Sequence, residues 1–447
     1  MSTSRKTLAI VLAAGQGTRM RSEKPKVLHQ IGHLSMLGHV LKALSDASVD
    51  KTAVVIGHNA DLVRTDIAAN APDVDVFEQT ERLGTAHAVL AARKAIEAFD
   101  GDHILVLYGD TPLVTADTLQ AISDGLEDGS DVVVTGFHTD EPGKYGRFIM
   151  DGERLMAIRE AKDATESELA ITFCNGGLKG FTREHCLSIL DRIDRNNAQG
   201  EYYLTDAVEI ANEIGLSVSA VPISETEVLG VNDRAQLARA ADLFQQRRRM
   251  DAMVSGVTLE APETVFFAYD TQLAIDVTVE PNVVFGPGVS VGSGSQIRAF
   301  SHLEGTRVET GAVIGPYARL RPGTVVHNGA KIGNFVETKK TTVERGAKIN
   351  HLSYVGDARV GEAANIGAGT ITCNYDGVSK YQTNIRAGAF IGSNSALVAP
   401  VTIGEGAFVG SGSVITDDVP DHALALGRGR QVVKQRWASA FRAKRKN

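Results

Sequence analysis

The stretch Leu12–Lys26, LAAGQGTRMRSEKPK, combines two glycines with several cations, among them the widely spaced Arg19 and Lys26. A dinucleotide fingerprint would need a third glycine where Met20 stands, and the Walker pattern is absent. Backbone N–H groups freed by glycine can approach a phosphate closely, and two cations can neutralise a triphosphate. The stretch therefore indicates either a nucleotide phosphate cradle or a plain strand–helix turn with solvated cations.

A second stretch, residues 339–357 (KKTTVERGAKINHLSYVGD), contains Lys339, His351 and Tyr354. In a solenoid whose coils take about 18 residues, Arg321 would stack on Lys339. Two stacked cations suit a sugar phosphate, whereas unpaired cations on a plain surface repel each other. A lone histidine is more often structural than catalytic, but its ordinary pKa near 6.5 suits proton transfer. Both interpretations of His351 stay open on these residues alone.

The first half of the chain alternates strand-like and helix-like patterns. Apolar runs typical of buried strands are TLAIVLA, KTAVVIG, HILVLYGD and DVVVTGF. Helical spacing recurs in two sets: Leu37, Val40, Leu41 and Leu44, then Val89, Ala92, Ile96 and Phe99. The pattern predicts a doubly wound (Rossmann-like) α/β domain with a mostly parallel sheet. Ligands bind such sheets at the carboxyl ends of strands, where LAAGQG and YGD both lie.

From about residue 275 the spacing of aliphatic residues changes to six. The residues with this period are Val279, Phe285, Val291, Ile297, Leu303, Val308, Ile314, Leu320, Val326, Ile332, Ile385, Ile391, Leu397, Ile403, Val409 and Ile415. A period of six predicts a parallel β-helix with the aliphatic inward and glycine at the corner. Such repeats resemble the left-handed β-helix family. The handedness rests on the resemblance, because the general crossover rule favours right-handed connections.

Two further segments organise the chain. Residues 233–254 lack Gly and Pro and predict a long helix between two domains. The stretch 339–357 interrupts the regular repeat, and the period breaks again at 372–384, TCNYDGVSKYQTN. An insertion between coils must loop out and often builds a binding face. The content of Asn374, Tyr375, Asp376 and Lys380 favours a functional loop over a tolerated surface loop.

The composition is that of ordinary globular material, with 43% hydrophobic and 22% charged residues. The net charge of -8 favours neither nucleic acid nor acidic membranes as partners. The apolar run near the N-terminus has about seven residues and enters a glycine loop, so a first strand is favoured over a signal peptide. Cys174, Cys186 and Cys373 are too few and too scattered for a disulfide framework or a zinc site. We expect a cytosolic, reducing environment.

Several longer motifs of the chain resemble those of a known enzyme family. G-x-G-T-R-M followed by P-K resembles the signature of sugar-nucleotide pyrophosphorylases, and QTERLGTAHAV, YGDTPL, KYGRF, REAKDAT, CNGG and GVNDR follow in family order. Together with the hexapeptide β-helix, the whole chain resembles the bacterial bifunctional N-acetylglucosamine-1-phosphate uridylyltransferase/glucosamine-1-phosphate N-acetyltransferases. One departure is Gly176, where the family commonly has threonine.

The resemblance implies a nucleotide and sugar site in the first half. Backbone groups of Leu12, Ala13, Ala14 and Gly15 would hold uridine and phosphates, and Lys26 would bind phosphate. Asp110 and Asn232 would bind Mg²⁺, the usual arrangement of oxygen ligands plus substrate phosphates. The residues implied to read the uracil are Gln79, Gly84 and Thr85, and those implied to line the sugar pocket are Tyr108, Gly109, Gly146, Glu160 and Asn175.

The resemblance also implies an acetyl-transfer site in the second half. His351 would be the general base that takes a proton from the glucosamine amine. Asn365 and Asn374 would orient the reacting groups. Ser411 is a departure, since the family often has alanine there, but a backbone contact would survive it. The residues implied to hold the sugar phosphate are Arg321, Lys339 and Tyr354, and those implied for acetyl-CoA are Ala368, Tyr375, Ser393, Ser411 and Arg428, with Asn374 beside them.

We therefore expect a uridylyltransferase domain at 1–232, a linker helix at 233–254 and a β-helix acetyltransferase domain at 255–447. The resemblance implies acetyl transfer to glucosamine-1-phosphate, then Mg²⁺-dependent uridylyl transfer from UTP. The product would serve peptidoglycan and lipopolysaccharide synthesis. Small-molecule substrates and a homotrimer with acetyltransferase sites between subunits are the expected partners, with no nucleic acid and no membrane.

Two alternatives remain. The β-helix could be only a trimerisation or allosteric scaffold of a pyrophosphorylase, although a scaffold has no need for the cluster around His351. A binding protein without turnover is disfavoured by Asp110 and Asn232 together with Lys26. The basic tail RGRQVVKQRWASAFRAKRKN, with the only tryptophan, Trp437, is either solvated or packed on a neighbouring subunit.

Overall fold

The computed structural model describes residues 5–57 and 60–445. The chain divides into two compact units, Met1–Phe244 and Gln245–Asn447, so the division falls inside helix α9 (Arg234–Val254). The helix predicted at 233–254 is confirmed. The domain limits 1–232, 233–254 and 255–447 stay a prediction.

The first unit is built on one mixed sheet in the strand order β11-β7-β10-β6-β1-β4-β5. β1 pairs in parallel with β4 and β6, β4 with β5, and β7 with β11, while β10 runs antiparallel to both its neighbours. The strands are β1 (Thr7–Ala13), β4 (Lys51–Gly57), β5 (Asp75–Gln79), β6 (His103–Tyr108), β7 (Val132–His138), β10 (Phe173–Thr182) and β11 (Val218–Pro222), with β8 (Arg147–Asp151) and β9 (Arg154–Arg159) beside β10 and a separate pair β2 (Gln30–Ile31) and β3 (Leu34–Ser35). All four predicted strands form.

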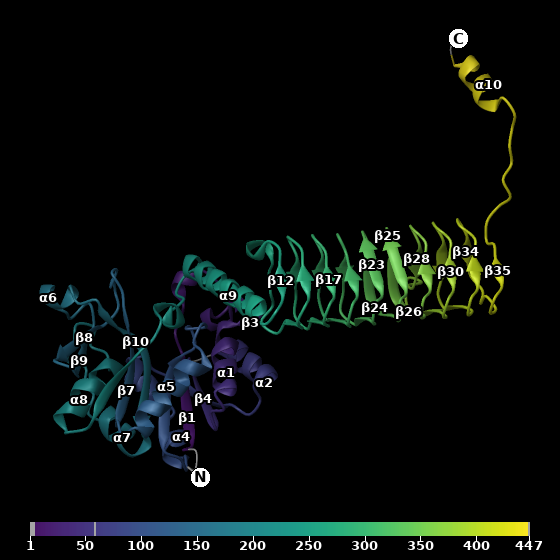
Figure 1. Cartoon of the computed structure of the whole chain (residues 1–447). Helices are drawn as coiled ribbons and strands as arrows, with labels where there is room; N and C mark the ends of the chain where they lie inside the picture. The colour runs from purple at the N-terminus through teal and green to yellow at the C-terminus, as the bar shows by residue number, and fades with distance from the viewer. Residues whose placement is uncertain (1–4, 58–59, 446–447) are drawn as a thin grey trace. The chain divides into compact units, whose positions relative to one another are not determined.

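Helices cover both faces of this sheet (Figure 1). Leu8 and Ile10 of β1 pack in one apolar cluster and Ala9 and Val11 in the other, so successive residues of a strand fill opposite cores. This is why the strands read as continuous apolar runs. The helices are α1 (Met36–Asp46), α2 (Asp61–Asn70), α3 (Thr85–Ala91), α4 (Arg93–Ala98), α5 (Ala116–Glu127), α6 (Glu166–Leu169), α7 (Arg183–Leu190) and α8 (Ala207–Glu213), with short 3₁₀ turns η1 (Thr18–Met20), η2 (Lys26–Leu28), η3 (Leu204–Asp206) and η4 (Glu225–Val228).

The single helix predicted around residues 89–99 is wrong in one respect. Ala92 has φ −94° and ψ 18°, outside the helical region, so α3 and α4 form in its place. The apolar spacing nevertheless marks the buried face, because Val89, Ala92, Ile96 and Phe99 are all buried. Periodicity reports which residues face the core and is insensitive to one residue of irregular backbone.

The second unit is a solenoid of short parallel strands, stacked coil upon coil from β12 to β35 (Figure 1). One ladder runs through β12 (Thr258–Leu259), β14 (Thr278–Val279), β17 (Gln296–Ile297), β20 (Val313–Ile314), β23 (Lys331–Asn334), β25 (Lys348–His351), β27 (Asn365–Ile366), β30 (Phe390–Ile391), β33 (Phe408–Val409) and β35 (Leu424–Ala425). The other sheet contains β13 (Gln272–Leu273), β15 (Val284–Phe285), β16 (Ser290–Val291), β18 (His302–Leu303), β19 (Thr306–Val308), β21 (Arg319–Leu320), β22 (Thr324–Val326), β24 (Glu337–Val343), β26 (Tyr354–Val360), β28 (Ile371–Cys373), β29 (Thr383–Ile385), β31 (Ala396–Val398), β32 (Val401–Ile403) and β34 (Val414–Ile415). A 3₁₀ turn, η5 (Pro262–Thr264), precedes the regular coils, and α10 (Trp437–Lys444) lies in the tail.

The six-residue period is confirmed as the core of this solenoid. Every aliphatic or aromatic residue of the predicted series is buried, and together they form one continuous cluster. Early coils take 18 residues, since Thr278 pairs with Gln296. An inward side chain every sixth residue therefore faces the same axis along the whole solenoid.

The predicted interruption at residues 339–357 is wrong, because β24, β25 and β26 continue the ladder there. The aliphatic pattern fails for two reasons. Thr338 takes an inward position and is buried, and the coil shortens to 17 residues, with Glu337 paired to Tyr354. By contrast, residues 375–382 lie exposed between β28 and β29, so the loop predicted at 372–384 is confirmed.

Candidate functional site

The glycine loop follows β1 and places Leu12, Ala13, Ala14 and Gly15 at the carboxyl end of that strand. Gly17 has φ 61°, and a Cβ there would overlap the Cβ of Lys26. Glycine is therefore required at this position, because it lets the Lys26 side chain pack against the loop. The loop and Lys26 form one structural element, although Gly17 and Lys26 are nine positions apart in the sequence.

Lys26 connects the two residues implied to bind metal. Its buried Nζ donates to the Asp110 carboxylate and to Oδ1 of Asn232, 3.2 Å away. Gln236 holds the backbone N–H of Asn232 at 2.7 Å, and Val231 N donates to the Asp110 carbonyl at 2.9 Å. A carboxylate and an amide oxygen thus converge on a cation, which is the ligand chemistry of Mg²⁺. The residues present fit that ion.

Most of the predicted nucleotide residues line one cavity of about 240 Å³. Sequence reasoning missed Arg82 and Glu201, which also line it; Arg82 lies inside the quoted QTERLG motif, whereas nothing in the sequence connects Glu201 to the loop. The predicted residues that the cavity brings together are Leu12, Ala13, Ala14, Gly15, Lys26, Gln79, Gly84, Thr85, Tyr108 and Asp110.

Gln79 is buried at the end of β5, and its amide is oriented by two neighbours. Nε2 donates to His87 Nδ1 at 3.1 Å and to the Gly84 carbonyl at 3.4 Å. Oε1 is then the group left to accept a hydrogen bond. Thr85 Oγ1 accepts from the backbone N–H of Leu204 at 3.0 Å, which ties the start of α3 to η3.

Of the predicted sugar residues, Tyr108 lines this cavity, whereas Gly109, Gly146, Glu160 and Asn175 do not. Asn175 N donates to the Gly146 carbonyl at 2.9 Å, and Gly109 N donates to the Leu12 carbonyl at 2.9 Å. Glu160 lines a separate hollow of about 480 Å³ together with Asp163 and Asp206. Burial, with Glu160 and Asp110 nearby, raises the pKa of the Tyr108 hydroxyl. Tyr108 therefore lies between the nucleotide cavity and the sugar residues.

In the solenoid, several of the residues implied for acetyl transfer follow one edge. The carbonyl of His351 accepts from Gly369 N, that of Ala368 from Asn394 N, and that of Ser393 from Gly412 N, at 3.3, 2.7 and 2.8 Å. Arg428 Nη1 then donates to the Ser411 carbonyl at 2.7 Å. His351, Ala368, Ser393 and Ser411 thus occupy equivalent positions in consecutive coils, about 5 Å apart.

His351 has a partner that sequence reasoning missed. Asn334 pairs with His351 in the ladder between β23 and β25, and the two side chains meet at 2.7 Å between Asn334 Oδ1 and His351 Nδ1. Because an amide oxygen only accepts, Nδ1 must carry the proton. This assignment leaves Nε2 of the neutral ring with a free lone pair. The sequence did contain a signal for this pair, because a spacing of 17 residues is close to the length of one coil.

The cations are arranged differently from the prediction. Arg321 does stack next to Lys339, but it is paired, because its Nη1 contacts Glu337 Oε1 at 2.8 Å. The neighbour of Lys339 is Lys380 from the inserted loop, whose ammonium lowers the pKa of Lys339. The argument from two unpaired stacked cations is therefore wrong for Arg321, which is paired with Glu337. Lys380 and, more weakly, Arg321 lower the pKa of Lys339, and Asp357 opposes them. Tyr354 lies on the coil after Glu337.

The inserted loop is anchored by Asn374, which is buried and donates to the Asp357 carboxylate. Tyr381 N donates to the Asn374 carbonyl at 2.9 Å, which closes the loop base, while Tyr375 is exposed.

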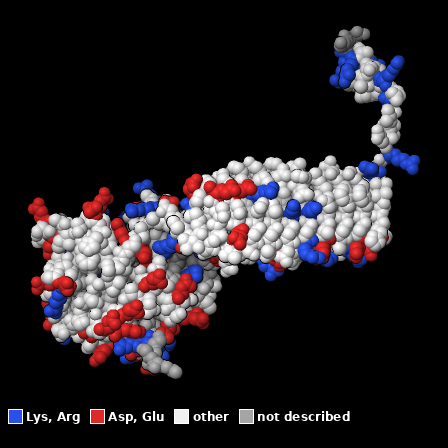
Figure 2. All heavy atoms as spheres, in the orientation of Figure 1, with Lys and Arg blue, Asp and Glu red and all other residues white. Residues whose placement is uncertain are grey.

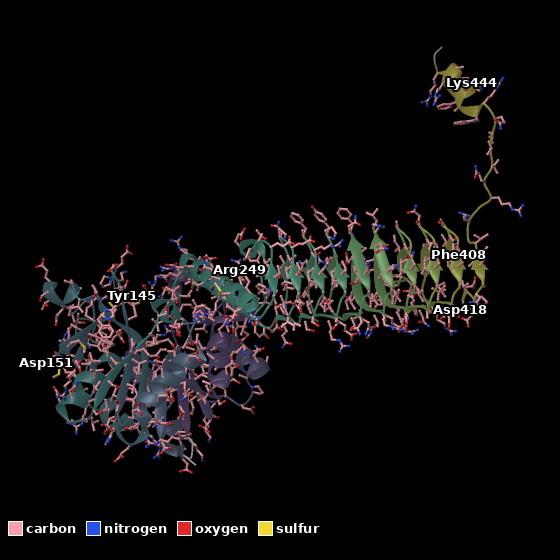
Figure 3. All side chains as sticks on the ribbon, viewed as in Figure 1. Tyr145, Asp151, Arg249, Phe408, Asp418 and Lys444 are labelled. Atoms are coloured by element: carbon pink, nitrogen blue, oxygen red, sulfur yellow. The ribbon has the colours of Figure 1, made fainter. Side chains whose placement is uncertain are left out.

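Asn365 lies on β27 between Lys348 and Phe390, and Phe390 stacks on Phe408, which Figure 3 labels. Asn365 thus belongs to the ladder next to the His351 edge.

The tail beyond Arg428 ends in α10, where Trp437 stacks on Phe441 with ring centroids 5.1 Å apart. Lys and Arg side chains gather around this helix (Figure 2).

No helix within residues 5–57 and 60–445 is long and apolar enough to span a bilayer. In the same described ranges, no cluster of three or more His, Cys, Asp or Glu side chains could hold a metal ion.

Two family descriptions match parts of the chain. Residues 9–173 match the MobA-like NTP transferase domain, and residues 382–417 match six repeats of the bacterial transferase hexapeptide. The first range contains the glycine loop, Lys26 and Asp110. The second contains the coils that carry Ser393 and Ser411.

Full-length relatives are closely similar. The chain is 59% identical over 443 residues to the bifunctional protein GlmU of Xanthobacter autotrophicus, covering 99% of both chains. It is 59% identical over 447 residues to the GlmU of Azorhizobium caulinodans, again with 99% of each covered. The GlmU of Agrobacterium fabrum is 53% identical over 442 residues, covering 99% of this chain and 97% of its own length.

Proposed function

Because the chain belongs to the bifunctional GlmU family, we propose that the first unit carries its uridylyl transfer and the solenoid its acetyl transfer. The chain is a transferase with both activities, which together make UDP-N-acetylglucosamine. The observation that carries the division is the separation of the residues: the Lys26 cavity lies entirely in one unit and the His351 edge entirely in the other.

In the first unit, UTP would lie in the cavity at the carboxyl end of β1. The Oε1 atom of Gln79 accepts the N–H of uracil, since its Nε2 is engaged by His87 and Gly84. The backbone of the glycine loop and Lys26 hold the phosphates. Tyr108, Gly109, Gly146, Glu160 and Asn175 orient the sugar phosphate. An oxygen of that phosphate attacks the α-phosphorus of UTP, and the bond to the leaving pyrophosphate breaks, which needs positioning and charge neutralisation rather than a protein nucleophile.

Asp110 and Asn232 are the residues that would hold Mg²⁺, whose charge offsets that of the phosphates during nucleotidyl transfer. Lys26 contacts both of these oxygens. Mg²⁺ on these oxygens would repel the ammonium, which would then turn to a phosphate, so the side chain has two alternative sets of partners. The geometry makes Lys26 a counter-charge for the residues that would bind the metal.

In the solenoid, His351 acts as general base. Its Nε2 takes a proton from the ammonium or amine of glucosamine-1-phosphate, and the amine nitrogen attacks the thioester carbonyl of acetyl-CoA. The tetrahedral intermediate collapses, the C–S bond breaks, and CoA leaves as the thiol after its sulfur receives the proton that His351 took. Arg321, Lys339 and Tyr354 hold the sugar phosphate, with Lys380 as an added cation. Asn365 and Asn374 orient the reacting groups.

Acetyl-CoA would follow the row of equivalent positions beyond His351. Ala368, Ser393 and Ser411 rise in consecutive coils, which suits an extended pantetheine arm. Arg428 at the end of the row supplies a cation for the CoA phosphates. The Ser411 carbonyl, rather than its hydroxyl, makes the contact with Arg428, so the departure at this position is tolerated. Tyr375 of the inserted loop borders the same site.

We place the enzyme in the cytosol as a left-handed solenoid assembled into a homotrimer with acetyl sites between subunits. Exposed apolar side chains support such an assembly, because Phe300, Tyr317 and Phe335 stack in a row while about half exposed. The basic tail with Trp437 is a candidate for packing on a neighbouring subunit. Sedimentation equilibrium of the full chain tests the subunit number.

The experiment that tests the proposed function measures free CoA thiol when the full chain meets acetyl-CoA and glucosamine-1-phosphate, without UTP or metal. Thiol release that requires the sugar phosphate is expected. Release of pyrophosphate from UTP, N-acetylglucosamine-1-phosphate and Mg²⁺ tests the other unit. If folded protein released pyrophosphate but no thiol, the solenoid would be only a scaffold, which was the alternative raised by the sequence.

A further inference from the structure

Lys179 of β10 is a lysine whose side chain is fully buried, with 0% of its surface exposed. Its Nζ donates to the Gly177 carbonyl at 3.2 Å. Among the residues that the structure describes, no carboxylate lies within salt-bridge distance of this ammonium. A buried ammonium is costly unless its surroundings compensate the charge. The position of Lys179 therefore requires an explanation that the nucleotide chemistry does not supply.

The compensation comes from carboxylates at the sugar side of the first unit. Burial lowers the pKa of Lys179 to about 8, and Glu160 and Asp206 oppose that shift. In turn, burial raises the pKa of Glu160, and Lys179 is the strongest influence in the other direction. The remaining groups that face this cluster are Thr205, whose hydroxyl donates to Glu160 at 3.2 Å, and Asp163, Asp194, Arg159, Glu209 and Tyr108.

Lys179 also holds the backbone turn that presents Asn175. The N–H of Gly177 donates to Oδ1 of Asn175 at 2.9 Å, while the carbonyl of Gly177 accepts from Lys179. Gly177 has φ 92°, and a Cβ there would come within 3.2 Å of the Tyr108 ring. The pairing of β10 with β7 shifts register between Asn175 and Lys179. With its oxygen engaged, Asn175 offers its NH₂ group to a ligand.

The same turn explains why Gly176 is tolerated. A Cβ at Gly176 would meet Thr135 Oγ1 at 2.7 Å and Ile223 Cδ1 at 3.1 Å. A side chain at this position would therefore face β7 and not the sugar side. Asn175 and Glu160 are the residues that determine the sugar pocket. Lys179 donates to the turn that holds Asn175, and its charge acts on the Glu160 carboxylate.

We propose that Lys179 is a positioning residue of the sugar site, which fixes the Asn175–Gly177 turn and places a positive charge near the Glu160 carboxylate, the group that accepts a sugar hydroxyl. The proposal rests on the proposed uridylyl transfer. Since Lys179 is fully buried, it acts through Asn175 and Glu160 and does not touch the ligand. Carboxylates are strong acceptors for hydroxyl groups only when ionised.

The test compares Lys179→Met with the wild-type full chain in uridylyl transfer. We expect the KM for N-acetylglucosamine-1-phosphate to rise about tenfold, as for loss of a hydrogen bond to a charged group. The KM for UTP should stay within about twofold, because the Gln79 cavity is untouched. The acid limb of kcat/KM for the sugar phosphate should move to higher pH, since Glu160 without its counter-charge binds a proton more readily.

Val63→Ala is the matched control, because it opens a cavity at a buried side chain of α2, outside β10, in the same unit. A merely structural role for Lys179 would give both variants a lower Tm with unchanged KM and pH profile, and would overturn the proposal. A wild-type chain without uridylyl transfer would instead overturn the proposed function.

A second measurement needs no variant. The ratio of the Kd of UDP to that of UDP-N-acetylglucosamine, measured by calorimetry on the wild type, isolates the contribution of the sugar. We expect this ratio to fall as the pH is lowered through the raised pKa of Glu160, because the protonated carboxyl group is the weaker acceptor for a sugar hydroxyl. A ratio that stays constant as the pH is lowered from 7 to 4.5 would contradict the proposal even if Lys179→Met failed to fold.

Discussion

In the first unit the ammonium of Lys26 is buried between two oxygen acceptors, whereas in the solenoid the ammonium of Lys339 lies exposed beside that of Lys380. The first arrangement satisfies the cation before any ligand arrives. The second concentrates like charge and lowers the pKa of Lys339. The comparison teaches that the uridylyl site must exchange partners on binding, while the acetyl site is built to receive an anion.

The largest effect should come from removing the excess charge of the solenoid site. We expect Lys339→Met/Lys380→Met to lower kcat/KM for glucosamine-1-phosphate about 100-fold, because contacts to a charged group contribute about 1.5–3 kcal/mol each. Uridylyl transfer should be unchanged. The matched control is Lys348→Met, which removes an exposed lysine from the neighbouring ladder. An equal loss in the control would mean that general surface charge, not this pair, attracts the substrate.

A smaller effect should follow from the residue that orients the base. Asn334→Ala removes the acceptor of the His351 Nδ1 proton, and we expect kcat for acetyl transfer to fall about tenfold, as for loss of an orienting hydrogen bond. The KM for acetyl-CoA should change little. Asn328→Ala, at an exposed position of the same solenoid, is the control. Full activity in Asn334→Ala would show that the ring is held by something else.

Lys26 offers a test of partner exchange. Without nucleotide, Lys26→Met should bind Mn²⁺ several-fold more tightly than the wild type, because an ammonium close to the ligand oxygens opposes a second cation. Electron paramagnetic resonance of the free ion measures this directly, and Lys24→Met, an exposed lysine nearby, serves as control. Equal affinity in Lys26→Met and wild type would rule out the exchange.

The smallest expected effect concerns pH and stability. His103 is buried, neither ring nitrogen has a partner, and burial lowers its pKa. Since the unfolded chain then binds more protons below about pH 6.5, the contribution is present above that pH and is lost as the pH falls. From pH 7.5 to 5.5 we therefore expect the folded chain to lose stability through this group. In His103→Leu the Tm should fall less over this pH range than in the wild type. An equal fall in both proteins would mean that other groups cause it.

Much of the fold could be predicted because its signals are local. An inward residue every sixth position needs no knowledge of distant segments, and the whole aliphatic series proved buried. The pattern failed where Thr338 replaces an aliphatic residue and a coil takes 17 residues. Likewise, the apolar spacing around Val89 marked a buried face but could not show the break at Ala92.

The site was predicted less completely, because its missing members depend on long-range geometry. Lys380 reaches Lys339 only through the conformation of the inserted loop. Lys179 lies under the sugar residues because β10 is inserted between β7 and β6. The Arg321–Glu337 pair follows from side chains that meet across coils, and no spacing rule distinguishes it from Arg321 with Lys339.

The independence of the two sites is tested most directly by measuring both half-reactions in His351→Ala and in Asp110→Ala, each purified as the full chain. The account predicts that His351→Ala loses thiol release by at least about 100-fold, as for loss of a general base, and keeps pyrophosphate release. Asp110→Ala should show the reverse. Loss of both activities in either folded variant would contradict the assignment of one reaction to each unit.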